Sequence, residues 1–225
     1  MATITSYTDK GLARVETTGS IVEAAGGIAV IVLSIIGLTR ADAGSLTSIA
    51  VIILGAAMLA EGSSIATEFS RLLSLTGAST LNGAEMGGGM LSEVVIGAGI
   101  LVLGVLSLLG VSGATLVPVA VIAGGGLLLV SAPSVQRMNE VRISTFEIPE
   151  SGQQLIQAAG SGAAGFQVLC GLAAVVLGIL ALTGTGTSTT GPEGMYALIG
   201  LLVLGASILI SGTVVTSNMM RLLKR

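Results

Sequence analysis

The residues that most often perform chemistry in proteins are nearly absent from this chain. It contains no histidine, so the commonest general base, proton shuttle and metal ligand is missing. Its single cysteine, Cys170, lies within an apolar run, where a small buried hydrophobe is the expected role. No phosphate-binding G-x-x-x-x-G-K-[ST] loop, G-x-S-x-G elbow or H-E-x-x-H pair occurs. We therefore predict a non-enzymatic protein with no catalytic residue, no metal ligand and no cofactor.

Three glutamates remain as candidates because each adjoins a long apolar segment: Glu23, Glu61 and Glu93. An ionisable group inside a membrane span is a functional hypothesis by default. These three fall at the ends of apolar runs and not at their centres, so we expect them at the interface between lipid and water. The repeat described below places no acidic residue at the same midplane position in all three copies.

The composition indicates a protein that lives in lipid. Of 225 residues, 52% are hydrophobic and 9% are charged, and the mean hydropathy is +0.98. A helix of about 20 residues crosses a hydrocarbon core of about 30 Å. Six apolar runs approach this length: 20–38, 46–60, 92–111, 116–132, 165–182 and 195–211. Open strands leave backbone groups unsatisfied in lipid, so we predict an all-α integral membrane protein with six transmembrane helices.

Basic residues predict the orientation of these helices. Eight of the nine lie on one side of a six-span arrangement, with Arg40 as the exception. Cytoplasmic loops accumulate Lys and Arg, so we expect both termini in the cytoplasm and a bacterial inner membrane as the location. Residues 28–43 imitate a cleavable signal peptide, but the preceding segment is too long and too acidic to favour that alternative.

The chain also repeats itself three times. "GAGILVLGVLSLLG" (97–110) matches "GLAAVVLGILALTG" (171–184), and "VLSIIGL" (32–38) matches "VLSLLGV" (105–111), at offsets of 74 and 73 residues. The even-numbered spans align without gaps, with Gly55, Gly125 and Gly205 in register. We predict three tandem helical hairpins. The expected divisions are a cytoplasmic segment 1–19, hairpin 20–77, cytoplasmic linker 78–91, hairpin 92–143, cytoplasmic linker 144–164 and hairpin 165–225.

Glycines mark the predicted contact faces. Gly97 and Gly104 are seven residues apart, as are Gly171 and Gly178, which places each pair on one stripe of its helix. Lipid offers no hydrophobic reason for helices to associate, so a small-residue stripe supplies close packing. The predicted packing positions are Gly55, Gly97, Gly104, Gly125, Gly171, Gly178 and Gly205. Whether they pack within one chain or between chains stays open.

Other segments suggest bending or an extension beyond the membrane. "AGGGLL" (123–128) with Pro118 upstream is a possible hinge, at Pro118, Gly124 and Gly126. Pro133 should kink or end its helix. "EFSRLL" (68–73) and "NMMRLL" (218–223) close two spans alike and predict amphipathic helix ends. The candidate residues for this cytoplasmic collar are Phe69, Arg71, Leu72, Arg221 and Leu222.

Two known families offer comparisons. Glycine-rich hairpins are similar to the proteolipid rotor subunits of ATP synthases, but the mid-helix carboxylate of those subunits has no counterpart here. Three two-helix repeats are similar to mitochondrial carriers, but no P-x-[DE]-x-x-[KR] motif follows an odd-numbered span. The sequence therefore assigns the chain to neither family.

Two functions fit these features. The first is a structural or scaffolding membrane protein that forms a homo-oligomer through its glycine-rich faces. The alternative is a passive channel or transporter for water, a gas or a small neutral solute, lined by Ser34, Ser48, Ser107, Thr183 or glycine backbone. The lipid bilayer is the expected partner; a nucleic acid is not, because the net charge is −3 and the basic residues are scattered. The sequence identifies no small-molecule ligand.

Overall fold

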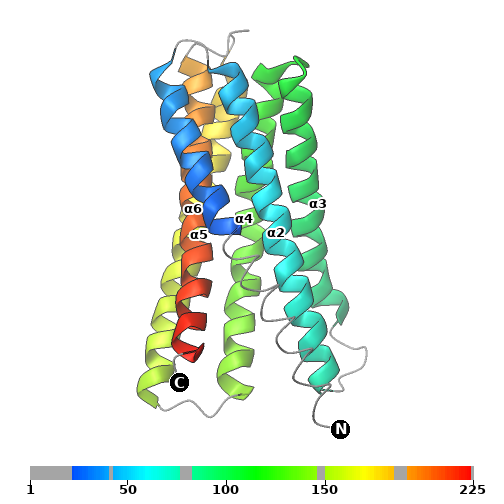
Figure 1. Cartoon of the computed structure of the whole chain (residues 1–225), viewed down its shortest axis with the longest axis vertical. Helices are drawn as coiled ribbons and strands as arrows, with labels where there is room; N and C mark the ends of the chain where they lie inside the picture. Colours follow the sequence, from blue (N-terminus) through cyan, green and yellow to red (C-terminus); the bar gives the residue numbers. More distant parts are fainter. Residues whose placement is uncertain (1–21, 41–42, 77–82, 146–149, 185–191, 224–225) are drawn as a thin grey trace.

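The computed structural model describes residues 22–40, 43–76, 83–145, 150–184 and 192–223, and it describes side chains within 22–40, 43–62, 92–131, 165–184 and 194–211. These residues form six helices that run nearly parallel to the long axis (Figure 1). They are the helix Val22–Thr39, α2 Gly44–Thr76, α3 Gly83–Leu108, α4 Gly113–Thr145, α5 Glu150–Thr183 and α6 Pro192–Leu223. The described chain is therefore all-helical, as predicted.

Five of these helices are long and apolar enough to cross a membrane. Their apolar windows are Val22–Thr39, Gly44–Gly62, Gly113–Ser131, Gly165–Thr183 and Gly194–Ser211. The described apolar part of α3, Ser92–Leu108, is shorter, so this helix does not meet the same length criterion. Five predicted spans are thus confirmed as apolar helices of sufficient length, while the third ends at Leu108 and not at the predicted Val111.

A tight turn explains why α3 ends early. Gly110 has a φ of 87°, a left-handed conformation that glycine adopts without steric cost. The amide of Gly110 donates to the carbonyl of Ser107, and the amide of Val111 donates to the carbonyl of Leu106. This pair of hydrogen bonds is the Schellman motif that satisfies the last carbonyls of a helix. The chain then turns directly into α4.

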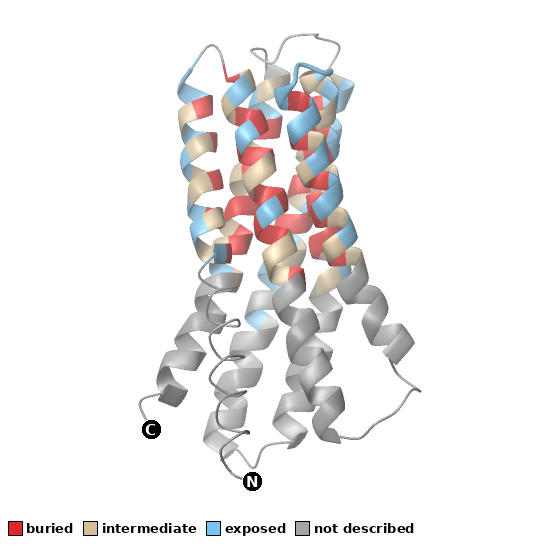
Figure 2. Ribbon diagram, turned by 45° about the vertical axis from the view of Figure 1, so that its right-hand side comes forward, coloured by how far each residue is buried: buried red, intermediate tan, exposed pale blue. Residues whose placement is uncertain are grey.

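Three helices form the interior of the bundle and three lie outside them. The helices α2, α4 and α6 contact one another, whereas α3 lies against α2 and α4, and α5 lies against α4 and α6. The helix Val22–Thr39 contacts both α2 and α6 through Gly26 and Gly27. In α2, α4 and α6, 44% of the apolar window is buried, against 28% in Val22–Thr39 and α5. Figure 2 shows the buried residues inside the bundle and the exposed ones on its outer surface.

Glycines hold each outer helix close to an inner one. A Cβ atom on Gly55 of α2 would lie 2.9 Å from the carbonyl oxygen of Gly97 on α3, and one on Gly125 of α4 would lie 2.7 Å from that of Gly171 on α5. A Cβ on Gly27 would likewise lie 2.9 Å from the carbonyl oxygen of Gly205 on α6. A Cβ on Gly104 of α3 would lie 2.8 Å from Ile52 of α2, and one on Gly178 of α5 would lie 2.5 Å from Ile122 of α4. All seven predicted packing glycines therefore contact neighbouring helices of the same chain.

Two expectations about helix limits change. α4 continues through Pro133 to Thr145, so this proline does not end the helix, and whether it kinks the helix stays a prediction. In addition, α3 begins at Gly83 and α5 at Glu150, so both helices start inside the segments expected to be linkers. The helices extend beyond the apolar windows at this end of the bundle, where the charged residues are concentrated.

The structure also bears on the proposed hinge and collar. Gly124 faces the interior, where a Cβ would lie 3.0 Å from Leu204 and 3.5 Å from Met58, whereas Gly126 has open space around it. Pro118 is buried within α4, which is one continuous helix, and whether the hinge bends stays a prediction. The collar residues lie on α2 and α6, outside the part of the chain whose side chains are described.

Neighbouring glycines on α4 provide a matched test of this packing. Gly125→Ala should destabilise the folded protein by about 1–3 kcal/mol, because the new methyl group would overlap the Gly171 carbonyl and Ala174. Gly126→Ala meets nothing within 4 Å and should be neutral or stabilise the helix by up to about 1 kcal/mol. Thermal unfolding of both variants in detergent measures the difference. Equal stabilities would show that this contact does not limit the approach of α4 and α5.

Candidate functional site

Three carboxyl groups meet inside the bundle, although they come from three different helices. Glu23, Glu61 and Glu93 lie on the helix Val22–Thr39, α2 and α3, and the carboxyl group of Glu61 is close enough to interact electrostatically with both others. Glu23 and Glu93 are only 3% and 5% exposed, and Glu61 is partly buried. Gly62 of α2 packs against Glu93 of α3, because a Cβ added to Gly62 would lie 3.4 Å from the Cβ of Glu93. Acidic residues far apart in sequence thus form one cluster.

A serine from a fourth helix joins the carboxylates. The Ser211 hydroxyl of α6 donates a hydrogen bond to Oε1 of Glu61 at 3.2 Å, and it also adjoins the carboxyl group of Glu23. Oε1 of Glu23 is fully buried and has no hydrogen-bond partner among the described residues. Buried carboxylate oxygens are normally hydrogen-bonded, because desolvation without a partner is costly. We call Glu23, Glu61, Glu93 and Ser211 the carboxylate cluster.

A second polar pair joins α4 and α5. The amide nitrogen Nε2 of Gln167 donates to the Ser131 hydroxyl at 3.5 Å. Gly124 of α4 contacts Leu204 of α6, and Ser131 and Ser211 each lie seven residues further along their parallel helices. Seven residues advance both chains by about 10 Å, so the two serines lie at a similar level. The neutral pair therefore completes a polar layer to which all six helices contribute.

Apolar side chains fill the bundle directly above this layer. Met58 and Leu204 come from two inner helices, are at most 1% exposed, and meet beside Gly124 of the third. Ile100 of α3 reaches the same place, 3.6 Å from the Cβ position of Gly124. We call Met58, Ile100 and Leu204 the apolar plug. In this conformation the plug separates the polar layer from the opposite end of the bundle.

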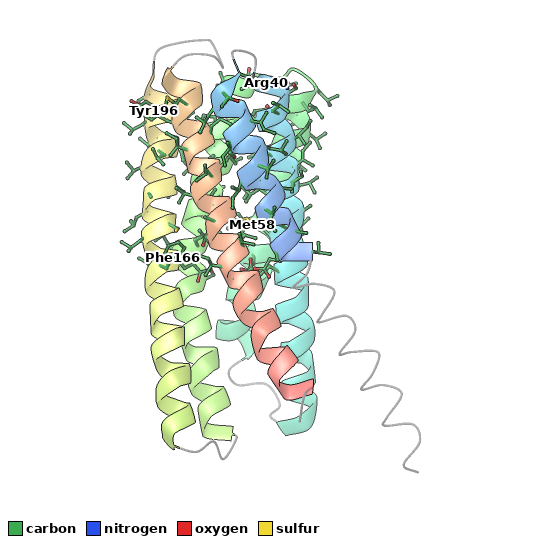
Figure 3. The ribbon with its side chains drawn as sticks, turned by 60° about the vertical axis from the view of Figure 1, so that its left-hand side comes forward. Arg40, Met58, Phe166 and Tyr196 are labelled. Atoms are coloured by element: carbon green, nitrogen blue, oxygen red, sulfur yellow. The ribbon has the colours of Figure 1, made fainter. Side chains whose placement is uncertain are left out.

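Arg40 is the only described basic side chain, and Figure 3 shows it at the far end of the bundle from Phe166, the residue that precedes Gln167. No group of three or more His, Cys, Asp or Glu side chains in the described ranges is arranged to hold a metal ion. The cluster is therefore acidic and is not a preformed multidentate metal centre in its described residues.

The glutamates lie at the predicted ends of the apolar segments, but two of them are buried between helices. Glu93, Gly97, Ile100 and Gly104 follow a spacing of four, three and four residues, and all four are buried. Glu23, Gly27, Val30 and Ser34 repeat this pattern. Extending the glycine stripe of α3 by one turn would have identified Glu93 as an interior residue, because residues at these spacings share one helix face.

The hydroxyl groups suggested as a pathway lining do not form a continuous line. Ser48 and Ser107 hydrogen-bond to each other at 2.7 Å between α2 and α3. Thr183 is exposed and donates to the carbonyl of Leu180 on its own helix. Ser34 is fully buried, and its hydroxyl has no partner among the residues described. The polar layer, and not this set, is the main polar feature of the described interior.

Comparisons with known protein families, curated proteins and solved structures found no match to this chain. Its class therefore follows from the fold alone. Apolar residues such as Val95, Leu169 and Val176 are more than half exposed on the outer helices. Such a surface suits lipid, and together with five helices of spanning length it defines a multi-pass membrane protein.

The hydrogen bond between Ser211 and Glu61 should appear as an energetic coupling. Ser211→Ala and Glu61→Gln are expected to be non-additive by about 0.5–3 kcal/mol in a double-mutant cycle, measured by reversible unfolding in detergent. Ser211→Ala combined with Ser48→Ala is the control. Ser48 lies 13 residues from Glu61 along α2, about 20 Å away, so this second pair should be additive. Equal coupling in both cycles would contradict the proposed contact.

Proposed function

We propose that this protein allows a small polar solute to cross the membrane, with the polar layer as its selective region. The observation that carries the proposal is the layer itself: polar side chains from all six helices lie at a similar level of a bundle whose described outer surface is largely apolar. Polar groups within membrane helices are rare and mark substrate or ion pathways. We do not propose an enzyme, because the described residues offer carboxylates and hydroxyls but no nucleophile placed beside a general base.

In this proposal the apolar plug controls passage through the bundle. Hydrophobic constrictions gate conduction by excluding water. Met58 and Leu204 meet at the bundle centre, so a solute held at the polar layer crosses only when this contact opens. The described conformation is then the closed one. A transporter that rearranges during each cycle fits this arrangement better than a permanently open channel.

We further propose that the bundle is built from three repeated units, with both termini in the cytoplasm. Three equivalent contacts support the repeat, namely Gly55 with Gly97, Gly125 with Gly171 and Gly205 with Gly27. They pair each inner helix with an outer one. By these contacts Gly27 corresponds to Gly97, an offset of 70 residues between the first two outer helices, whereas the sequence match gave 73. The sequence bias of basic residues supports the orientation.

The sequence-based hypothesis of a scaffold now has less support. It relied on glycine faces that were free to join separate chains, and these glycines pack within one chain. A homo-oligomer stays a prediction, but another surface would have to form it. A location in the bacterial inner membrane also stays a prediction.

Topology can be tested by cysteine labelling. A cysteine placed at Arg40 in a Cys170→Ala background should react with a membrane-impermeant maleimide in intact cells, because Arg40 lies at the end of the bundle opposite Leu223, the last described residue. A cysteine placed at Arg225 should react only after the cells are opened. The reverse pattern would show that both termini face outward.

Solute flux tests the function directly. Vesicles that contain the purified protein should take up a small polar solute, such as glycerol or an alkali cation, faster than protein-free vesicles do. Leu204→Ala removes part of the apolar plug and should increase this flux, although burial predicts a cost of about 2–5 kcal/mol in stability. Stopped-flow light scattering or an ion-sensitive dye inside the vesicles provides the measurement.

Leu169→Ala is the matched control because Leu169 is 67% exposed on α5 and faces away from the interior. It should leave both flux and stability unchanged. If neither the folded wild-type protein nor a folded Leu204→Ala variant increases flux for any of these solutes, transport through this bundle would be rejected.

A further inference from the structure

The helix Val22–Thr39 carries two buried oxygen atoms that have no hydrogen-bond partner among the described residues: Oε1 of Glu23 and the hydroxyl oxygen of Ser34. Glu23 is 3% exposed and Ser34 is fully buried. Their positions differ by 11 residues, which is about three helical turns, so both lie on one face of the helix about 16 Å apart. Buried polar atoms that the protein leaves unsatisfied normally bond to a bound molecule. One helix face thus presents two unused acceptors.

This face packs against α6. The Ser211 hydroxyl adjoins the carboxyl group of Glu23 at one end, and at the other end a Cβ added to Gly37 would lie 2.8 Å from Cδ2 of Leu198. Residue numbers rise along one helix as they fall along the other, so the two helices are antiparallel. We call this contact, from Glu23 to Gly37, the seam. The two unpartnered oxygens therefore lie along one continuous helix contact.

Apolar side chains separate the two oxygens within the seam. Val30 is fully buried between them, and a Cβ added to Gly205 of α6 would lie 3.0 Å from its Cγ1 atom. Gly205 follows Leu204, so this contact adjoins the apolar plug. The antiparallel register places Ser34 near Leu201, a fully buried residue whose side chain has no hydrogen-bonding atom. A molecule that moves along the seam therefore meets a polar atom on each side of an apolar contact.

We propose that a small neutral molecule that bears hydroxyl groups passes along the seam and donates hydrogen bonds to Glu23 on one side of Val30 and to Ser34 on the other. The inference rests on the proposed function, because it names the class of solute and its route. Two acceptors require a donor, and no group of His, Cys, Asp or Glu side chains in the described ranges could hold a metal ion. A charged donor would lose its hydration beside Val30 and Leu201, so a neutral O–H donor fits best.

Cysteine labelling tests this route. In a Cys170→Ala background, Ser34→Cys keeps a side chain of similar size and should react with a small water-soluble methanethiosulfonate in vesicles that contain the full chain. Glycerol at about ten times its dissociation constant should slow the reaction about tenfold, because only the glycerol-free fraction reacts. Potassium chloride at the same osmolarity should not slow it. Mass spectrometry of the intact protein measures the modified fraction.

Ser107→Cys in the same background is the matched control. Ser107 is also a buried serine of an outer helix, but its hydroxyl group is hydrogen-bonded to Ser48 between α2 and α3, away from the seam. It should stay unmodified over the time in which Ser34→Cys reacts. Equal reaction of both variants would overturn the route, because labelling would then report general access to the bundle.

Ser34→Ala separates transport from folding. Removal of an unpartnered hydroxyl group should leave the midpoint of thermal unfolding unchanged or raise it, and should lower glycerol flux about fivefold, which is the effect of one hydrogen bond. The same variant tests the route if Ser34→Cys does not fold. Glycerol flux at the wild-type rate in folded Ser34→Ala would overturn the inference.

The outcomes distinguish this route from the proposed function. Glycerol flux in the wild-type protein without labelling or protection at Ser34→Cys would keep transport and reject the seam as its route. Protection by glycerol without flux would keep the seam as a binding site and reject transport. Protection by potassium chloride and not by glycerol would overturn the assignment of a neutral solute.

Discussion

The close approach of helix backbones at glycine is the constraint on which the rest of the structure depends. In lipid, apolar side chains gain little by leaving their surroundings, so helices associate where their surfaces fit closely. Gly55, Gly125 and Gly205 bring each inner helix against the carbonyl of a glycine on an outer helix. Because side chains at these points would separate the helices, the same three contacts fix both the distance and the axial register of each pair.

That register determines where polar groups meet. Glu93 lies one turn before Gly97, and Glu61 lies six residues after Gly55, so the contact between Gly55 and Gly97 brings the two carboxylates to the same level. The corresponding contact of Gly205 with Gly27 brings Ser211 to Glu23. The carboxylate cluster is thus a consequence of glycine packing and does not need a loop or an irregular backbone to assemble it. A rigid helical frame also keeps acidic groups together that would otherwise repel one another.

The sequence was sufficient for the helices but not for the site. Apolar run length predicted five spans because hydrocarbon thickness sets that length directly. The end of α3 was missed by three residues, since the run "LLGV" stays apolar through the Gly110 turn and hydropathy alone carries no information about φ.

The offset of 73 residues between the first two outer helices differs from the contact register by three residues. That difference is almost one helical turn, so similar apolar residues fall on the same face in either alignment. The interior position of Glu93 was readable from the stripe of Gly97 and Gly104, but its meeting with Glu23 depends on two further helices, whose arrangement no local pattern encodes.

The difference between the acidic and neutral parts of the polar layer follows from electrostatics in a low-dielectric interior. If Ser131 and Gln167 were also acidic, five carboxylates would share one level with no described basic side chain nearby, and their mutual repulsion would oppose the close packing that glycine permits. A hydroxyl and an amide satisfy each other instead, as the hydrogen bond between Gln167 and Ser131 shows. α4 and α5 are therefore joined by a neutral hydrogen bond, while the helix Val22–Thr39, α2 and α3 carry the carboxyl groups. The apolar plug lies where the acidic and neutral parts of the bundle meet, because Met58 and Ile100 come from the acidic side and contact the position of Gly124 on the neutral one.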